Sequence, residues 1–302
     1  MMVRRACPYE LSVVEAPASC YGIPMRFEPE LTSPRPPGTP GPLFLFRGSD
    51  LLVRLRDGVA EVPTGAGPAS VGLEAPVVLH VGEADGEPCR AAEVAGGEAP
   101  EGWEFTGLRA LFSTLPAPLF RVAGRAQMLV DWERTNRYCG RCGTATRAKE
   151  GERARECPAC GHLAYPRISP AMIVAVTRGD RILLVRHHRF PQRFTVVAGF
   201  VEPGETLEEC VHREVREETS LEISEPRYFS NQPWPFPHSL MVGFQAEHVS
   251  GEIRVEPAEL IEGDWFKADA LPQVPDRVTI ARRLIDAFVA GQRPGQPGAH
   301  PG

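Results

Sequence analysis

The chain has 302 residues, 42% of them hydrophobic and 24% charged, so it can bury a sizeable core, and its length suggests two or three domains. No apolar run approaches the roughly 20 residues of a membrane span, and no apolar stretch follows the basic N-terminus, which argues against a membrane or secreted protein. The net charge of −6 argues against a broad nucleic-acid surface but leaves local basic patches open. We expect a cytoplasmic protein.

Residues 1–133 are predicted to form a separate N-terminal α/β domain. Apolar runs at 51–56 and 59–62 flank an Asp-Gly turn, which is typical of a β-hairpin, and residues 77–81 predict another strand. No catalytic group of residues is found in this part.

The rest of this domain is predicted as loops and helices. The proline-rich residues 33–42 and the Gly/Glu-rich residues 82–101 are expected to be surface loops. Residues 108–113 and 119–134 show helical periodicity, and the second segment leads into the next domain.

Two Cys-x-x-Cys pairs lie in residues 134–167, with fourteen residues between them, and each pair is followed by glycine. Four thiolates complete a tetrahedral Zn²⁺ shell and leave no position for water, so the pattern predicts a structural zinc ribbon; a redox pair or a disulfide is the alternative. The predicted zinc ligands are Cys139, Cys142, Cys157 and Cys160. The remaining cysteines, Cys7, Cys20, Cys89 and Cys210, are expected to be free thiols.

Residues 168–290 are predicted to form the catalytic domain. Short apolar runs at 172–176 and 182–185 suit strands of a mixed sheet, and residues 278–290 predict a closing helix. Residues 291–302 are rich in Gly and Pro and are expected to be a disordered tail.

A helix is predicted over residues 206–219, with Thr206 and Glu209 at the spacing of a capping box. Three acids of this helix, Glu214, Glu217 and Glu218, fall within an arc of roughly 100°. Carboxylates so close repel one another unless a cation neutralises them, and hard oxygen ligands select Mg²⁺ or Mn²⁺. The alternative is a solvated charged face held by i,i+4 ion pairs.

A second motif follows at residues 231–241, Asn-Gln-Pro-Trp-Pro-Phe-Pro-His-Ser-Leu-Met. Alternating prolines forbid a helix, so we expect a rigid aromatic surface rather than a packed element. A nicotinamide or adenine ring can stack there, with Gln232 or Ser239 orienting its polar groups. A proline-rich loop that binds a partner is the alternative.

The acidic helix and the turn before it resemble the Nudix box, in which Gly, Glu, Arg-Glu and Glu-Glu follow one another at fixed spacing. The matching residues are Gly199, Glu205, Arg213, Glu214, Val215, Glu217, Glu218 and Leu221, with Ser220 where the family has Gly. In the left-handed conformation that ends such a helix, Ser costs about 1 kcal/mol. This departure concerns the end of the helix and no metal ligand.

The zinc ribbon, the box and the Trp-Pro motif, in this order, resemble the NADH pyrophosphatase and NAD-capped RNA hydrolase branch of the Nudix family over residues 105–289; Asn231 replaces the family's Ser. The resemblance implies an α+β protein: a Nudix α/β/α sandwich with a mixed sheet, preceded by a four-cysteine zinc ribbon and an α/β N-terminal domain. It also implies a homodimer with shared active sites.

The same resemblance assigns further site residues. Phe200 and the partner's Tyr165 would sandwich the nicotinamide base, although ordinary packing is the alternative for both. The other implied positions are Gln232, Trp234 and Ser239 in the pocket, Glu259 as a further metal ligand, Ala281 at a phosphate-binding position, and Glu152 as a ribbon acid near the substrate.

The expected reaction is metal-assisted hydrolysis of NAD(H) to AMP and nicotinamide mononucleotide, with Glu218 as general base. Arg213 is expected to brace Glu205 rather than bind substrate. Removal of the NAD cap from RNA is a second reading, in which basic residues guide the RNA, with solvated loop charges as the alternative; these residues are Arg186, His187, His188, Arg189 and Arg193. The third reading is a non-catalytic module that senses nucleotides or binds nucleic acid.

Overall fold

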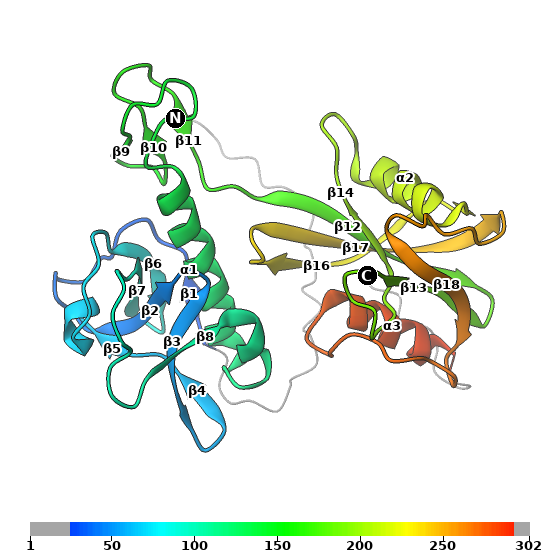
Figure 1. The fold of residues 1–302 in the computed structure, drawn as a ribbon, viewed down its shortest axis with the longest axis horizontal. Coiled ribbons are helices and arrows are strands. Elements are labelled where there is room, and N and C mark those ends of the chain that lie inside the picture. Colours follow the sequence, from blue (N-terminus) through cyan, green and yellow to red (C-terminus); the bar gives the residue numbers. More distant parts are fainter. Residues whose placement is uncertain (1–24, 293–302) are drawn as a thin grey trace, which may run out of the picture.

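The computed structural model describes residues 25–292, so Cys7, Cys20 and most of the predicted tail lie outside the described range. The chain forms an N-terminal sheet covered by helix α1 (Ala117–Thr135) and a small three-stranded ribbon at the far end of α1. A second sheet carries helices α2 (Leu207–Thr219) and α3 (Ile280–Gly291) (Figure 1). The predicted α+β class is confirmed.

The N-terminal sheet has the strand order β1-β6-β7-β2-β3-β4, with β5 paired to β2 and β8 to β3. Its strands are β1 (Phe27–Glu28), β2 (Gly41–Arg47), β3 (Asp50–Arg56), β4 (Val59–Glu61), β5 (Thr64–Gly65), β6 (Leu79–Ala84), β7 (Glu87–Glu93) and β8 (Glu104–Gly107). The helices are η1 (Pro68–Val71), η2 (Leu108–Ser113) and α1 (Ala117–Thr135). The β2–β7 pairing is parallel, so the sheet is mixed. Alternate side chains such as Phe44 and Phe46 pack under α1 and form the core of this domain.

Most elements predicted in this domain are confirmed. The β3–β4 hairpin turns at Asp57 and Gly58, whose φ angles of 49° and 79° suit a tight hairpin turn. The two helical segments are η2, which is a 3₁₀-helix, and α1. The predicted strand at 77–81 begins two residues later, as β6.

The prediction of a surface loop over residues 82–101 is wrong. Most of this segment is the end of β6, a turn at Asp85-Gly86, and β7. The inward side chains of β7 are small, Cys89 and Ala91, and both are fully buried. The composition of this segment does not indicate a strand, because it is rich in Gly and Glu and its buried side chains are small.

The ribbon contains β9 (Arg147–Ala148), β10 (Arg155–Glu156) and β11 (Leu163–Ala164), all antiparallel. Its buried hydrophobic residues are Cys139, Ala154 and Cys157, too few for an independent core. A largely buried ion pair from Arg155 Nη1 to Glu133 Oε1 of α1 (2.7 Å) fixes the ribbon to the N-terminal domain.

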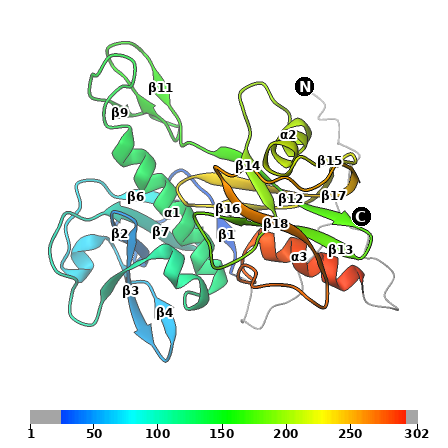
Figure 2. The same ribbon diagram turned by 45° about the vertical axis from the view of Figure 1, so that its right-hand side comes forward.

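The second sheet has the order β15-β17-β12-β13-β18, with β14 paired to β12 and β16 to β17. Its strands are β12 (Ser169–Arg178), β13 (Arg181–His187), β14 (Val197–Phe200), β15 (Glu222–Ile223), β16 (Arg227–Trp234), β17 (Ser239–Ser250) and β18 (Leu260–Lys267). Helices α2 (Leu207–Thr219) and α3 (Ile280–Gly291) cover opposite faces of the sheet, each over its own hydrophobic cluster (Figure 2). The predicted helices, apolar strands and mixed sheet are confirmed, since β12 and β17 are parallel.

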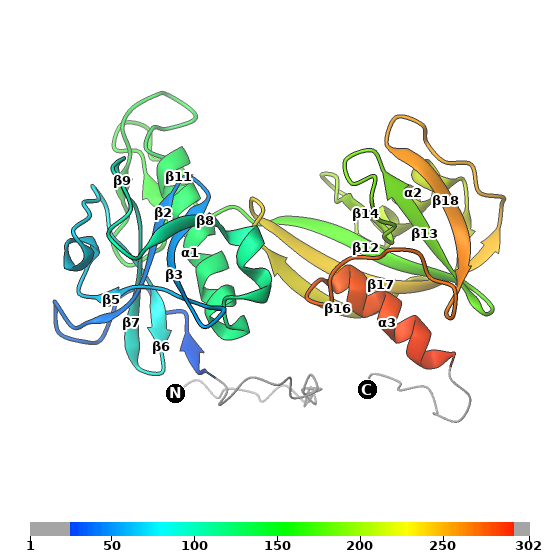
Figure 3. The same cartoon turned by 60° about the horizontal axis from the view of Figure 1, so that its bottom comes forward.

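The expectation that the Trp-Pro motif is not a packed element is wrong. Its first residues belong to β16, which pairs with β17 from Arg227↔Gln245 to Trp234↔Ser239. The strands β16 and β17 point toward the N-terminal domain (Figure 3). There Trp234 lies 5.7 Å from Phe112 of η2 between ring centroids, and Phe236 packs against the N-terminal core. The motif therefore joins the two domains.

Candidate functional site

Helix α2 begins and ends as its sequence predicts. Glu209 N donates to Thr206 Oγ1 (3.2 Å), and Thr206 N donates to Glu209 Oε2 (2.8 Å), which completes the capping box. Ser220 ends the helix in the left-handed conformation, with φ 60° and ψ 23°. Its hydroxyl donates to Arg254 O at 3.3 Å, a contact that a glycine cannot make.

Arg213 is the centre of an ion-pair network at the solvent side of α2. Its Nε and Nη2 donate to both carboxylate oxygens of Glu205, at 2.7 and 2.9 Å, as predicted. Its Nη1 donates to Glu214 (2.9 Å) and Glu217 (3.0 Å), and its Nη2 also donates to Phe200 O (3.0 Å). The guanidinium thus ties the turn after β14 to the acidic helix.

The Arg213 network predicts that the stability of the folded protein falls at low pH. The hydrogen bonds from Arg213, and then the one from Glu202 N, lower the pKa of Glu205 from 4.5 to about 2. The unfolded chain takes up this proton near pH 4.5 and the folded chain only near pH 2. The stabilisation is therefore complete above pH 4.5 and is lost as the pH falls toward 2.

Denaturant unfolding at about pH 5, 4, 3 and 2 checks this expectation. The free energy of unfolding should fall less steeply in Glu205→Gln than in the wild type. Glu202→Gln, which alters an exposed neighbouring carboxylate, should follow the wild type. Equal slopes for the wild type and Glu205→Gln would refute the assigned pKa.

The three box glutamates of α2 differ strongly in exposure. The Glu217 side chain is 60% exposed, that of Glu214 is 14% exposed, and Glu218 is only 3% exposed. Burial, and then the charges of Glu214, Glu259 and Glu217, raise the pKa of Glu218 to about 8; burial also raises that of Glu214. The buried Oε2 of Glu218 accepts no hydrogen bond within residues 25–292.

These carboxylates fit a divalent cation. A buried carboxylate oxygen without a partner is costly, and a hard cation is the group that oxygen donors of this kind bind. Arg213 Nη1 donates to both Glu214 and Glu217 and so holds these two carboxylates on one side of the helix. The side chain of Glu259, on the loop before β18, is exposed and close enough to influence the charge of Glu218.

Gly199 of β14 makes room for one of these carboxylates. A Cβ at this position would lie 1.9 Å from the carboxyl carbon of Glu214, far inside contact distance. The family pattern includes this glycine, but the sequence does not show why a glycine is needed, because the contact between β14 and α2 appears only in the folded structure.

Gly199→Ala is therefore expected to displace the Glu214 carboxylate and leave the sheet intact, since only the end of a flexible side chain must move. Turnover should fall about tenfold or more, with a weaker apparent affinity for Mg²⁺, because a misplaced charged group costs at least about 1 to 2 kcal/mol. Metal titrations of the activity measure both effects. Gly67→Ala, where a Cβ meets no atom within 4 Å, is the control; unchanged metal dependence in Gly199→Ala would contradict the account.

The four predicted zinc ligands come together in the ribbon. Their Sγ atoms all lie within 4.8 Å of one another, the only such group of metal-binding side chains found in residues 25–292. The Sγ–Sγ distances include 3.5 Å (Cys142–Cys157), 3.6 Å (Cys142–Cys160) and 3.7 Å (Cys139–Cys160), close to the roughly 3.8 Å edge of a tetrahedron with Zn–S bonds of about 2.3 Å. All four are free thiols, which excludes the disulfide alternative in this structure.

The glycines after the two cysteine pairs have the expected role. Gly143 and Gly161 adopt φ angles of 74° and 69°, and their N–H groups donate to the carbonyls of Cys139 and Cys157. Each turn folds its cysteine pair around a common point. The cluster of four cysteines supports structural zinc.

The pocket residues of the Trp-Pro motif are held by the surrounding protein. Gln232 Nε2 donates to Val278 O (2.8 Å), and Ile280 N donates to Gln232 Oε1 (2.7 Å), so this amide fixes the start of α3. Ser239 is buried and Trp234 is half-buried. Gln232 therefore positions the start of α3, and its amide keeps a second N–H group that these two hydrogen bonds do not use.

The remaining predicted site residues differ in how far their side chains are exposed. Phe200 and Tyr165 are 57% and 54% exposed, which does not agree with ordinary packing within one chain. Tyr165 Oη donates to Glu152 Oε2 at 2.7 Å, so these two ribbon residues lie together. Ala281 is buried at the first turn of α3, so only its backbone can face a ligand.

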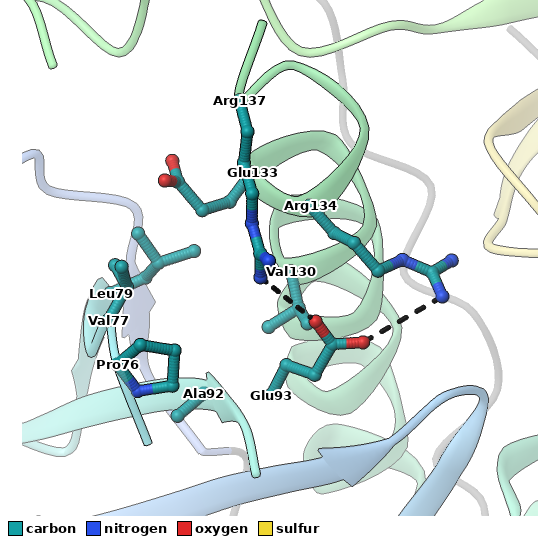
Figure 4. A pocket seen from close by; sticks show the side chains of 9 residues that line it. All are labelled: Pro76, Val77, Leu79, Ala92, Glu93, Val130, Glu133, Arg134 and Arg137. Atoms are coloured by element: carbon teal, nitrogen blue, oxygen red, sulfur yellow. Dashed lines mark hydrogen bonds and ion pairs between the residues drawn. The ribbon is translucent and has the colours of Figure 1, made fainter. Parts of the chain in front are cut away.

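A small hollow in the N-terminal domain is separate from all these residues. It lies between α1 and the sheet, where Glu93 pairs with Arg134 and Arg137 (Figure 4). Its volume of about 10 Å³ holds at most one water molecule. It contains no predicted site residue. Within residues 25–292, no helix has the length and apolar character needed to cross a membrane.

Three family models match consecutive parts of the chain. Residues 40–132 match the NADH pyrophosphatase-like rudimentary NUDIX domain, residues 134–165 the NADH pyrophosphatase zinc ribbon domain, and residues 167–288 the NUDIX domain. The first match was not expected from the sequence, because this domain lacks the acidic box.

Among curated proteins, the chain is similar to enzymes named NAD-capped RNA hydrolase NudC. The relative from Stutzerimonas stutzeri is 46% identical over 74% of this chain and 82% of its own length. The relative from Deinococcus radiodurans is 44% identical over 85% of this chain and 91% of its own length. With this similarity and the complete acidic box on α2, the chain belongs to the Nudix hydrolase family, in the branch that carries the NADH pyrophosphatase zinc ribbon.

Proposed function

We propose that this protein hydrolyses the pyrophosphate bond of NAD(H), giving AMP and nicotinamide mononucleotide, and that it removes the NAD cap from RNA 5′ ends. The observation that carries the proposal is a pair of carboxylates on α2, half-buried Glu214 in the space left by Gly199 and buried Glu218 with an unpaired oxygen. The names of the relatives supply the substrate class. All box carboxylates are present, which disfavours a non-catalytic nucleotide sensor.

Glu214, Glu217, Glu218 and Glu259 are the residues we propose to hold Mg²⁺ or Mn²⁺. When bound, such ions neutralise pyrophosphate oxygens and make a water molecule more acidic. We assign Glu218 as general base because its Oε2 is buried beside the other acids and has no other partner within residues 25–292. Arg213 keeps the carboxylates in place rather than contacting substrate, since four protein groups already occupy its donors.

The pocket for the base lies, in this proposal, between the acidic helix and the Trp-Pro motif. Phe200 offers an exposed ring beside the box, and Gln232, Trp234 and Ser239 line the far end. Tyr165, placed by Glu152, would complete the pocket from a second subunit, which is why we propose a homodimer. Ala281 would offer its backbone N–H to a phosphate at the start of α3.

We further propose a cytoplasmic location, and a division into an N-terminal domain (1–133), a zinc ribbon (134–167), a Nudix domain (168–290) and a tail (291–302). The ribbon is the link between the first and third of these units, since Arg155 binds Glu133 and β11 leads into β12.

Parallel turnover assays test the proposal. NADH, NAD⁺ and a short RNA with a 5′ NAD cap should each be cleaved with Mg²⁺ or Mn²⁺, and none after chelation of the metal. Cleavage of a nucleoside triphosphate in preference to all three substrates would overturn the assigned substrate class.

A further inference from the structure

The loop between β13 and β14 contains a group of two arginines, exposed Arg189 and half-buried Arg193, around one exposed aromatic ring. The loop begins beside the proposed metal site, where His188 N donates to Glu259 O at 3.2 Å. The guanidinium carbons of Arg189 and Arg193 lie 5.6 and 4.9 Å from the centroid of the Phe190 ring, which is 36% exposed.

A third arginine joins this group from the N-terminal domain. Arg109 of η2 lies over the rings of Phe236 (4.4 Å) and Trp234 (5.5 Å) of the Trp-Pro motif. Partial burial, and then the positive charges of Arg189 and Arg193, lower the pKa of Arg109. The basic group therefore extends from Glu259 to the aromatic end of the proposed pocket.

These three arginines lack the partners that neutralise others nearby. Arg186, at the end of β13, forms an ion pair with Glu262 at 2.8 Å. Within residues 25–292, Arg109, Arg189 and Arg193 have no carboxylate within 4.0 Å. Clustered cations repel one another, so in a chain of net charge −6 the group is suited to a bound polyanion.

The chemistry of the group indicates single-stranded nucleic acid. Guanidinium groups bind phosphates in a two-pronged geometry, and an exposed aromatic ring beside them can stack a base. We propose that Arg109, Phe190, Arg189 and Arg193 bind the first nucleotides of an RNA whose 5′ cap occupies the active site. This inference rests on the proposed function. A free dinucleotide has no phosphate beyond its pyrophosphate, so the surface contributes to capped RNA alone.

The proposal predicts a selective loss in Arg189→Gln/Arg193→Gln. For single strands, each phosphate contact contributes about 0.7 to the slope of log affinity against log salt concentration. Loss of two contacts should therefore lower kcat/KM for capped RNA roughly 25-fold at about 0.1 M salt. The log–log salt slope should become shallower by about 1.4. Hydrolysis of NADH by the same variant should be unchanged.

The control variant is Arg56→Gln/Arg147→Gln, which removes the same amount of charge from the N-terminal hairpin and the ribbon. The two side chains are 59% and 67% exposed, and their loss should leave both activities unchanged. Phe190→Leu tests the stacking separately and should reduce the activity on capped RNA alone. Equal losses on both substrates, or an unchanged salt slope, would overturn the inference. A wild type that cleaves NADH but no capped RNA also overturns it, whereas a wild type that cleaves neither overturns the proposed function instead.

Discussion

Glu218→Gln is expected to lower kcat for NADH hydrolysis by about 10²–10⁴-fold, the usual contribution of a positioned general base. The fold should persist, because glutamine has the same shape and removes a buried charge that Glu214 and Glu259 repel. In the absence of metal, the variant should be at least as stable as the wild type at about pH 8. Steady-state kinetics and thermal unfolding measure the two effects.

Glu208→Gln is the matched control for this change. Glu208 lies in the first turn of the same helix and is exposed, so its loss removes one negative charge without touching the site. It should keep near-normal turnover. Near-normal turnover of Glu218→Gln as well would refute the role assigned to Glu218.

Cys157→Ser is expected to abolish zinc binding and unfold the ribbon. Cys157 is 1% exposed, and the ribbon has almost no other buried apolar residue, so the metal supplies the stability that a core would give. Structural zinc contributes about 10–16 kcal/mol in small zinc peptides, far more than three short strands can replace. Activity should fall with it, because Tyr165 and Glu152 lie on the ribbon.

Zinc content and limited proteolysis measure this outcome. The wild type should hold zinc and resist cleavage within the ribbon, whereas Cys157→Ser should lose both properties. Cys89→Ala changes a buried thiol in the N-terminal sheet and should retain zinc. A zinc-free chain with an intact ribbon and full activity would contradict the structural role of the metal.

The acidic helix and the zinc ribbon could be predicted because both depend on local chemistry. The caps of α2, the left-handed residue at Ser220 and the glycine turns after each cysteine pair are set by neighbouring residues. The spacing of these residues in the sequence therefore determines how they are placed in the structure.

The errors arose where distant segments meet. Strand β7 is stabilised by parallel pairing with β2, which no local pattern reveals, and its buried side chains are small. Prolines in the Trp-Pro motif indicated a rigid surface rather than a packed element, but β16 bonds to β17 on one side only, and an edge strand tolerates residues without an N–H. The contact of Arg109 with Trp234 likewise joins residues of different domains.

The most direct test of the central claim is the identity of the products from NADH and Mg²⁺ or Mn²⁺, resolved by chromatography for the wild type and Glu218→Gln. The wild type should give equal amounts of AMP and reduced nicotinamide mononucleotide, and the variant only traces of both. Release of free nicotinamide, or equal product formation by the two proteins, would contradict pyrophosphate hydrolysis by the carboxylates of α2.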